Sequence, residues 1–322
     1  MKGWTLETEE VEEIGTVEDA GSDDEPEIDD TPLKAPFPYF GGKRSVAADV
    51  WKYLGSDIKH YVEPFCGSLA VMLAAPRKPR LEVVGDGSFY VANFWRAVKH
   101  QPAEVARWAD YPVSHVDLSA RHAWLTKPER VRCLSADLLD PEHPGCAQAA
   151  GWWVWGQCAW IGSGWCEKEV KAQISSQIPH IITAGKGIQG IIDGDRREHI
   201  ERWFTRLARR LQDVRVIHGD WRRCLNTNYG GDGEKVGIFF DPPYLGYERL
   251  YREQKPVATP VAEWCAERPQ MRIVLCGHVG DYDDVLRGWE VVRWSRGKMT
   301  YNGGGTTDKE AMYLSPACLH AK

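Results

Sequence analysis

The chain has 322 residues, of which 43% are hydrophobic and 27% are charged, and its net charge is −6. This composition is that of a globular protein with one large domain or two modest ones. No run approaches the roughly 20 apolar residues of a membrane span, and the N-terminus lacks the pattern of a signal peptide. The nine cysteines form no C-x-x-C pair and, like the histidines, show no metal-ligand spacing. These features predict a cytoplasmic protein of a reducing compartment, without a metal or a membrane partner.

The acidic residues are concentrated at the N-terminus. Residues 1–30 contain thirteen Asp or Glu and one Lys, a charge of −12, which leaves +6 on the remaining residues. Dense acid with few apolar residues predicts a disordered arm over 1–31. The basic remainder indicates a surface for a polyanion. The arm either mimics that polyanion or only adds solubility.

Strand and helix patterns alternate after the arm. Helical spacing is present over Leu69–Ala75, Phe89–His100, Ala147–Trp160 and Glu198–Leu211. Apolar runs predict strands at Tyr61–Phe65, Leu81–Val84, Val214–His218, Val236–Phe240 and Arg272–Cys276, with a closing hairpin of Trp289–Trp294 and Glu310–Leu314. The alternation predicts an α/β fold with a mostly parallel sheet and helices on both faces. Residues 110–194 break the pattern and are predicted to be an insertion between 32–109 and 195–322.

The strongest motif is Asp241-Pro242-Pro243-Tyr244, which directly follows an apolar strand. Ligands of open α/β sheets bind beyond the carboxyl ends of the strands. The prolines fix a rigid turn that presents the Asp241 carboxylate and the Pro242 carbonyl as acceptors beside the Tyr244 ring. Two acceptors and a stacking face suit a flat ring with an exocyclic amino group. Such acceptors favour a pyramidal nitrogen whose lone pair points toward an incoming methyl group. The plain alternative is a proline turn in which Tyr244 only packs.

Two glycine turns precede this motif. The first turn, which leads into a helix, is Pro38-Tyr39-Phe40-Gly41-Gly42-Lys43. The second turn leads from a strand into a second helix and is Glu63-Pro64-Phe65-Cys66-Gly67. Glycine lets the backbone approach a ligand closely. Asp86 follows at the end of the next strand, where an acid accepts hydrogen bonds from ribose hydroxyls. Since these turns contain no phosphate-binding fingerprint, a nucleoside without a pyrophosphate fits best, although each turn alone is also explained as a tight connection.

The chain resembles the Dam-like (D12 class) DNA adenine-N6 methyltransferases, most of all the phage-borne members. The resemblance lies in the content and order of four motifs, Tyr39–Lys43, Glu63–Gly67, Asp86 and Asp241–Tyr244. The resemblance covers about 36–316. It implies a Rossmann-like SAM-dependent methyltransferase sheet with an inserted target-recognition region. It also implies S-adenosyl-L-methionine (SAM) as the cofactor and a flipped adenine in DNA, most simply duplex DNA, as the acceptor.

The resemblance also implies a role for individual residues. Tyr39 and Lys43 would contact the methionine end of the cofactor, Asp86 would hold its ribose, and Asp241 would touch both cofactor and target amine while Tyr244 stacks on the base. Phe40, Gly41, Gly42, Glu63, Phe65 and Gly67 complete the implied cofactor site. Asp220-Trp221 resembles the family's Asp-Phe pair beside the cofactor adenine, but Asp220 also suits a helix N-cap.

Two positions depart from the family pattern. Leu69 stands where the cofactor turn usually has a second glycine, and Trp160–Trp165 stands where an Asn-Gly and a base-reading Arg are usual. No base-reading residue is therefore assigned, and the recognition sequence and oligomeric state stay open. Cytosine-N4 or RNA-adenine methylation remains a related alternative, and a catalytically silent DNA-binding module is an alternative of another class.

Overall fold

The computed structural model describes residues 32–39, 41–79, 81–160, 165–166, 187–190, 195–225, 235–245, 257–294 and 310–319. Leu33–Lys322 form one compact unit. The arm predicted over 1–31 lies outside the described residues.

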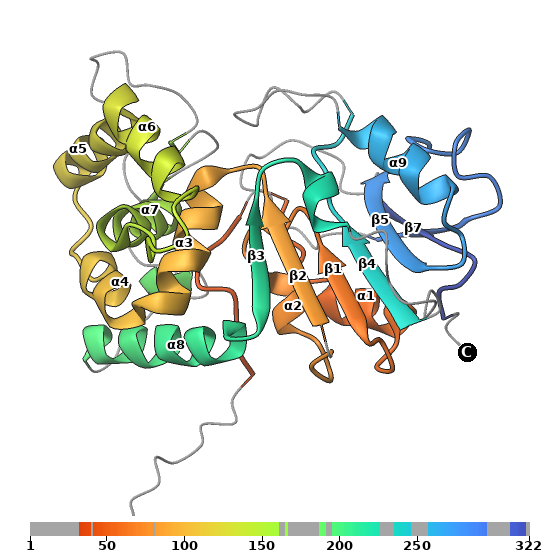
Figure 1. Ribbon diagram of the computed structural model, residues 1–322, viewed down its shortest axis with the longest axis horizontal. Helices are drawn as coiled ribbons and strands as arrows, with labels where there is room; N and C mark the ends of the chain where they lie inside the picture. The colour runs from red at the N-terminus through yellow and green to blue at the C-terminus, as the bar shows by residue number, and fades with distance from the viewer. Residues whose placement is uncertain are drawn as a thin grey trace, which may run out of the picture. The chain divides into compact units, whose positions relative to one another are not determined.

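A seven-stranded sheet, in the order β3-β2-β1-β4-β5-β7-β6, is the centre of the described unit (Figure 1). The five strands from β3 to β5 are parallel, and the β6/β7 hairpin joins β5 antiparallel. This arrangement confirms the predicted α/β class and is consistent with a Rossmann-like methyltransferase sheet. The strands are β1 His60–Glu63, β2 Leu81–Asp86, β3 Val214–His218, β4 Val236–Phe240, β5 Arg272–His278, β6 Glu290–Arg293 and β7 Glu310–Leu314.

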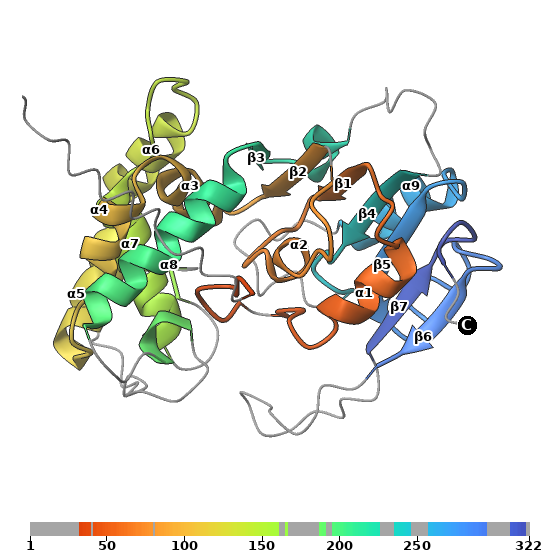
Figure 2. The same cartoon turned by 90° about the horizontal axis from the view of Figure 1, so that it is seen from below.

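The central strand β4 shows why these runs are apolar throughout. All five of its residues are buried, as expected where both faces of a parallel sheet are covered. Phe239 packs in the core that includes α1 (Ala47–Leu54), whereas Ile238 and Phe240 pack in the core that includes α9 (Ala258–Ala266). Figure 2 shows α1 and α9 on opposite sides of the sheet.

The remaining helices lie mostly beyond the β3 edge of the sheet (Figure 1). In this region α7 and α8 both pack on α3 and α4. The remaining helices are α2 Ala70–Leu73, α3 Phe89–His100, α4 Pro102–Ala109, α5 His115–Thr126, α6 Pro128–Asp137, α7 Ala147–Ala159 and α8 Arg196–Leu211, with the short 3-10 helices η1 Gly187–Gly190 and η2 Trp221–Cys224. The predicted α3, α7 and α8 are confirmed, and α2 is shorter than predicted. The boundaries of the insertion at 110–194 stay a prediction.

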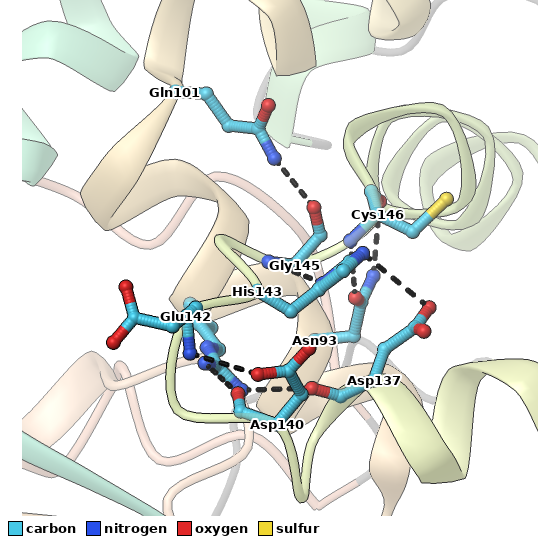
Figure 3. A network of polar contacts seen from close by, with 9 residues as sticks. Asn93, Gln101, Asp137, Asp140, Glu142, His143, Gly145 and Cys146 are labelled. Carbon is cyan, nitrogen blue, oxygen red and sulfur yellow. Dashed lines mark hydrogen bonds and ion pairs between the residues drawn. The ribbon is translucent and has the colours of Figure 1, made fainter.

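A polar network ties the loop between α6 and α7 to α3 and the start of α4 (Figure 3). The side chain of Asn93 on α3 donates to the Cys146 carbonyl at 3.1 Å and accepts from the Cys146 N–H at 2.8 Å. Gln101 donates to the Gly145 carbonyl at 2.5 Å. Because α3 also packs against β2 and β3, it connects this loop to the sheet.

In the described part of the chain, no helix has both the length and the apolar character needed to cross a membrane.

Candidate active site

The carboxyl ends of β1, β2 and β4 lie side by side, because β1 pairs with both of the other strands. Glu63 ends β1, Asp86 ends β2, and Asp241 follows β4 directly. The three acids singled out in the sequence therefore come to the same edge of the sheet. This edge is where an open α/β sheet binds its ligand.

Lys43 joins the first motif to the last. Its Nζ lies 2.6 Å from Oδ1 and 2.7 Å from Oδ2 of Asp241, and it donates to the Gly41 carbonyl at 2.6 Å. The Lys43 side chain is 3% exposed and that of Asp241 is 16% exposed. Removing either partner from such a pair leaves a poorly solvated charge, so each side chain holds the other in place. The sequence placed both residues in the site but gave no indication of their pairing, which depends on the fold.

The glycines before Lys43 form a tight turn. The Gly42 N–H donates to the Tyr39 carbonyl at 2.8 Å, and a side chain at Gly42 would meet that carbonyl oxygen at 3.0 Å. Gly41 has a φ of +76°, in the left-handed region that favours glycine. The turn therefore depends on both glycines. Phe40, predicted for the same site, lies outside the described residues.

The Gly67 turn and Asp86 support each other. Asp86 accepts from the Gly67 N–H at 3.0 Å and from the Ser88 N–H at 2.8 Å. Trp95 on α3 donates to the Gly67 carbonyl at 2.8 Å. A Cβ on Gly67 would lie 2.6 Å from Cδ1 of Tyr39, so a glycine is needed where the Tyr39 ring covers the turn.

Leu69 stands at the position where the D12 class pattern usually has a second glycine. Its φ of 57° and ψ of 25° are left-handed, and its side chain is fully buried. The left-handed conformation costs a non-glycine residue about 1–2 kcal/mol. Burial of a leucine side chain contributes about 1.5–3 kcal/mol, which offsets that cost. The backbone thus keeps a conformation that favours glycine, although the residue is leucine.

Glu63 is a buried acid without a cation beside it in the described residues. Its Oε2 accepts from the Tyr61 hydroxyl at 2.9 Å and from the Met72 N–H at 3.2 Å. Burial raises the pKa of Glu63 to about 8, against these two hydrogen bonds and with a further contribution from the negative charge of Asp241. Glu63 is therefore largely protonated at neutral pH. As a neutral group it still bonds Tyr61 and Met72 at the end of β1.

Tyr244 contacts His278, and Lys43 lies near both the Tyr244 ring and the ring of Trp294. The Tyr244 ring meets His278 edge-on, with centroids 4.9 Å apart at 76°. Lys43 Nζ lies 5.3 Å from the Tyr244 ring centroid and 5.8 Å from that of Trp294. His278 ends β5 and Trp294 follows β6, and no local motif marks either one. Of the turn's prolines, Pro242 is buried and Pro243 is half-buried.

Asp220 and Trp221 lie in different environments, since Asp220 is exposed and Trp221 is buried. Asp220 caps η2 by accepting from the Arg222 N–H at 2.9 Å, and its side chain is 55% exposed. Trp221 is buried and meets Phe240 at 5.9 Å and Trp264 at 6.3 Å between centroids, close to perpendicular in both cases. The capping role of Asp220 is therefore present. The contact of both residues with a cofactor stays a prediction.

The residues at this edge fit a nucleoside cofactor. A glycine turn at Gly67 allows close approach, Asp86 is fixed beside it, and half-buried Phe65 lies 6.4 Å from the Phe240 ring. The buried indole N–H of Trp221 has no hydrogen-bond partner among the residues that the structure describes. Among the described residues, no three His, Cys, Asp or Glu side chains group as metal ligands.

Residues 39–114 match the family model of the D12 class N6 adenine-specific DNA methyltransferases. The match supports an adenine-specific DNA methyltransferase. It includes the Tyr39–Lys43 and Glu63–Gly67 motifs and Asp86, and it ends well before Asp241. Members of this enzyme class use SAM as the methyl donor and DNA as the substrate. None of the curated proteins matches the chain, and the resemblance to phage-borne members stays a prediction.

Proposed function

We propose that this protein transfers a methyl group from SAM to the N6 amino group of an adenine that is flipped out of duplex DNA. The observation that carries the proposal is the buried Lys43–Asp241 pair beside the Tyr244 ring. It fixes an acceptor and a stacking face at the ligand-binding edge of the sheet. The matched family supports adenine as the base.

In the proposed reaction, Asp241 and the Pro242 carbonyl accept hydrogen bonds from the two N–H groups of the target amine, which takes the methyl group from the sulfonium of the donor and then loses one proton. A carboxylate accepts up to about four hydrogen bonds, so Lys43 and the amine can bind Asp241 together. Tyr244 stacks on the flipped base, whose extrusion costs about a few kcal/mol. When bound, SAM supplies the electrophilic methyl group. The protein contributes alignment of the amine with that group, which is a large source of rate enhancement.

The cofactor is proposed to lie along the Gly67 turn. Asp86 would receive its ribose hydroxyls, and Tyr39 and Lys43 would lie near its methionine end. Asp220 and Trp221 would flank its adenine. We assign target recognition to the insertion over 110–194. A cytoplasmic location is supported by the nine cysteines, all of which are free thiols.

The test is mass spectrometry of nucleosides from duplex DNA of mixed sequence, incubated with SAM and either the wild-type protein or Asp241→Ala. We expect N6-methyladenine from the wild type and a loss of at least about 10²–10³-fold in the variant, the effect of removing one positioned hydrogen-bonding group. Asp49→Ala is the matched control, because Asp49 also pairs with a lysine at 2.6 Å but on the exposed surface.

Each alternative has its own outcome in this assay. Near-normal turnover by Asp241→Ala contradicts the mechanism, and methyl on cytosine N4 contradicts the choice of base. Transfer only to RNA moves the substrate to RNA. If calorimetry detects no binding of SAM, the catalytically silent DNA-binding module is the remaining alternative.

A further inference from the structure

A basic groove follows β3, the edge strand of the sheet. A cleft of about 470 Å³ lies between β3, α3 and the end of α6, and a hollow of about 260 Å³ continues it past the carboxyl end of β3. Leu138, Val216 and His218 line both. We call the cleft and the hollow together the β3 groove. Its basic side chains are Arg96, Lys99, His100, Arg215, His218 and Arg223.

Among the described residues, the permanent cations of the β3 groove make no direct ion pair with a carboxylate, although the charge of Asp213 acts on Lys99. Arg96 donates to the carbonyls of Asp137, Asp140 and Pro141 at 2.6–3.3 Å. Lys99 donates to the Val214 carbonyl at 3.0 Å, and Arg223 donates to the His218 carbonyl at 2.6 Å.

Arg215 is exposed and makes no ion pair or hydrogen bond with a described residue. Carbonyl oxygens accept hydrogen bonds from the other three cations, Arg96, Lys99 and Arg223, but leave their charge in place.

The acid that lines the cleft is shared between two lysines. Asp213 pairs with Lys78 at 2.7 Å, and its charge also acts on Lys99, so one carboxylate faces two cations. The carboxylate of Asp137 lies 3.8 Å from His143. Burial, together with the charges of Lys99 and Arg96, lowers the pKa of His100. By contrast, other arginines of the molecule pair directly with acids, as Arg210 does with Glu82 at 2.5 Å. The β3 groove thus keeps a net positive charge.

We propose that the β3 groove binds the sugar–phosphate backbone of duplex DNA. The cations run from Lys99, at the start of β3, to Arg223, beyond its end. A five-residue strand spans about 16 Å, whereas duplex DNA carries one charge per about 1.7 Å of axis. The groove is therefore long enough to meet several phosphates of a polyanion, while a small anion would reach only one end.

This proposal rests on the proposed function for the identity of the polyanion, because a DNA methyltransferase must bind DNA beyond its target base. The β3 groove shares no residue with the candidate active site. Phosphate contacts position a protein on DNA without reading sequence. The groove therefore contributes affinity and orientation, not target choice.

The test compares two double variants with the same loss of charge. Arg215→Gln with Arg223→Gln removes two exposed cations of the β3 groove. Lys52→Gln with Arg202→Gln removes two cations, each 67% exposed, from α1 and α8. Affinity for a duplex of unrelated sequence is measured by fluorescence anisotropy between 50 and 200 mM salt, and methyl transfer is measured on the same preparations.

For the groove variant we expect the slope of log affinity against log salt to fall by about 2, since each phosphate contact contributes about 0.9. Affinity at low salt should fall on the order of tenfold. The control variant should keep the wild-type slope, and SAM affinity should be unchanged in both. If the two variants have equal slopes and the protein still methylates DNA, the proposal that the β3 groove binds DNA is wrong, whereas the proposed function stands. A wild type that neither binds nor methylates duplex DNA overturns the proposed function as well, and groove-dependent binding of structured RNA in place of duplex DNA overturns the choice of partner.

Discussion

Basic side chains meet two different environments in this molecule. At the strand ends Lys43 faces the carboxylate of Asp241 with little solvent around the pair. Along β3, Lys99 and Arg223 donate to backbone carbonyls and make no direct ion pair with a described residue, and Asp213, whose charge acts on Lys99, is itself paired with Lys78. A compensated pair fixes geometry but exerts little field at a distance, whereas uncompensated cations attract a distant anion. The first arrangement suits positioning of a reacting group, and the second suits capture of a polyanion.

Lys43→Met gives the largest expected effect. It should lower the free energy of unfolding by about 3–5 kcal/mol, because Asp241 loses the cation that compensates it. Lys52→Met breaks a pair of the same length, 2.6 Å, whose partners are 67% and 44% exposed. It should cost at most about 1 kcal/mol. Urea unfolding of both variants is the measurement, and equal losses would show that burial does not distinguish the two pairs.

Glu63→Gln sharpens the comparison by testing an acid that is buried without a cation. Its pKa is about 8 in the folded protein and 4.5 in the reference state, so between these values the folded protein holds a proton that the unfolded chain loses. The free energy of unfolding should therefore fall as pH rises, by about 1.4 kcal/mol per unit or roughly 3 kcal/mol from pH 5 to 7.5.

The glutamine variant should lose this part of the pH dependence while keeping the Tyr61 and Met72 hydrogen bonds. Denaturant midpoints at pH 5 and 7.5 measure it, with the exposed Glu129→Gln as control. Parallel pH profiles of the wild type and Glu63→Gln would contradict a protonated Glu63.

Tyr244→Ala should weaken transition-state binding by about 1–3 kcal/mol through lost base stacking. Tyr244→Phe should stay close to wild type, because it keeps the ring face. The ratio kcat/KM for methyl transfer measures both. A phenylalanine variant as impaired as the alanine variant would assign the role to the hydroxyl group.

The smallest expected effect is that of deleting residues 1–30, which carry a charge of −12. Affinity for duplex DNA at 50 mM salt should rise several-fold, and the gain should vanish by about 300 mM as salt screens the charge. Anisotropy titrations of the two chains measure it. An unchanged low-salt affinity would leave the arm a solubilising role only.

The sheet and the acids at its edge were predictable from the sequence, and the side chains around them were not. Apolar runs such as Val236–Phe240 have the length of a strand and are followed at once by turn residues. These two features predict where the strands lie. The helices α5 and α6 escaped prediction because α5 buries Arg121 and His122 among its apolar residues, and α6 buries only Leu134. Neither one shows a continuous apolar stripe.

The partners within the site were missed for a related reason. The Lys43–Asp241 contact joins positions 198 residues apart, and His278 and Trp294 reach the site only through the pairing of β5, β6 and β7. Motifs indicate which residues have a role, but contacts between motifs come from the three-dimensional fold.

The helix α3 has a consequence for protein engineering. On it, Trp95 donates to the Gly67 carbonyl in the turn proposed to bind the cofactor, and Asn93, two residues away, bonds the backbone of Cys146 in the α6–α7 loop. A chimera that exchanges the helical region with that of another enzyme must therefore retain a matching Asn93–Cys146 clamp across the splice. If the clamp is lost, the grafted helices lose this attachment to α3. Grafts with and without Asn93 would then separate a change in the specificity proposed for this region from a loss of activity caused by the missing attachment.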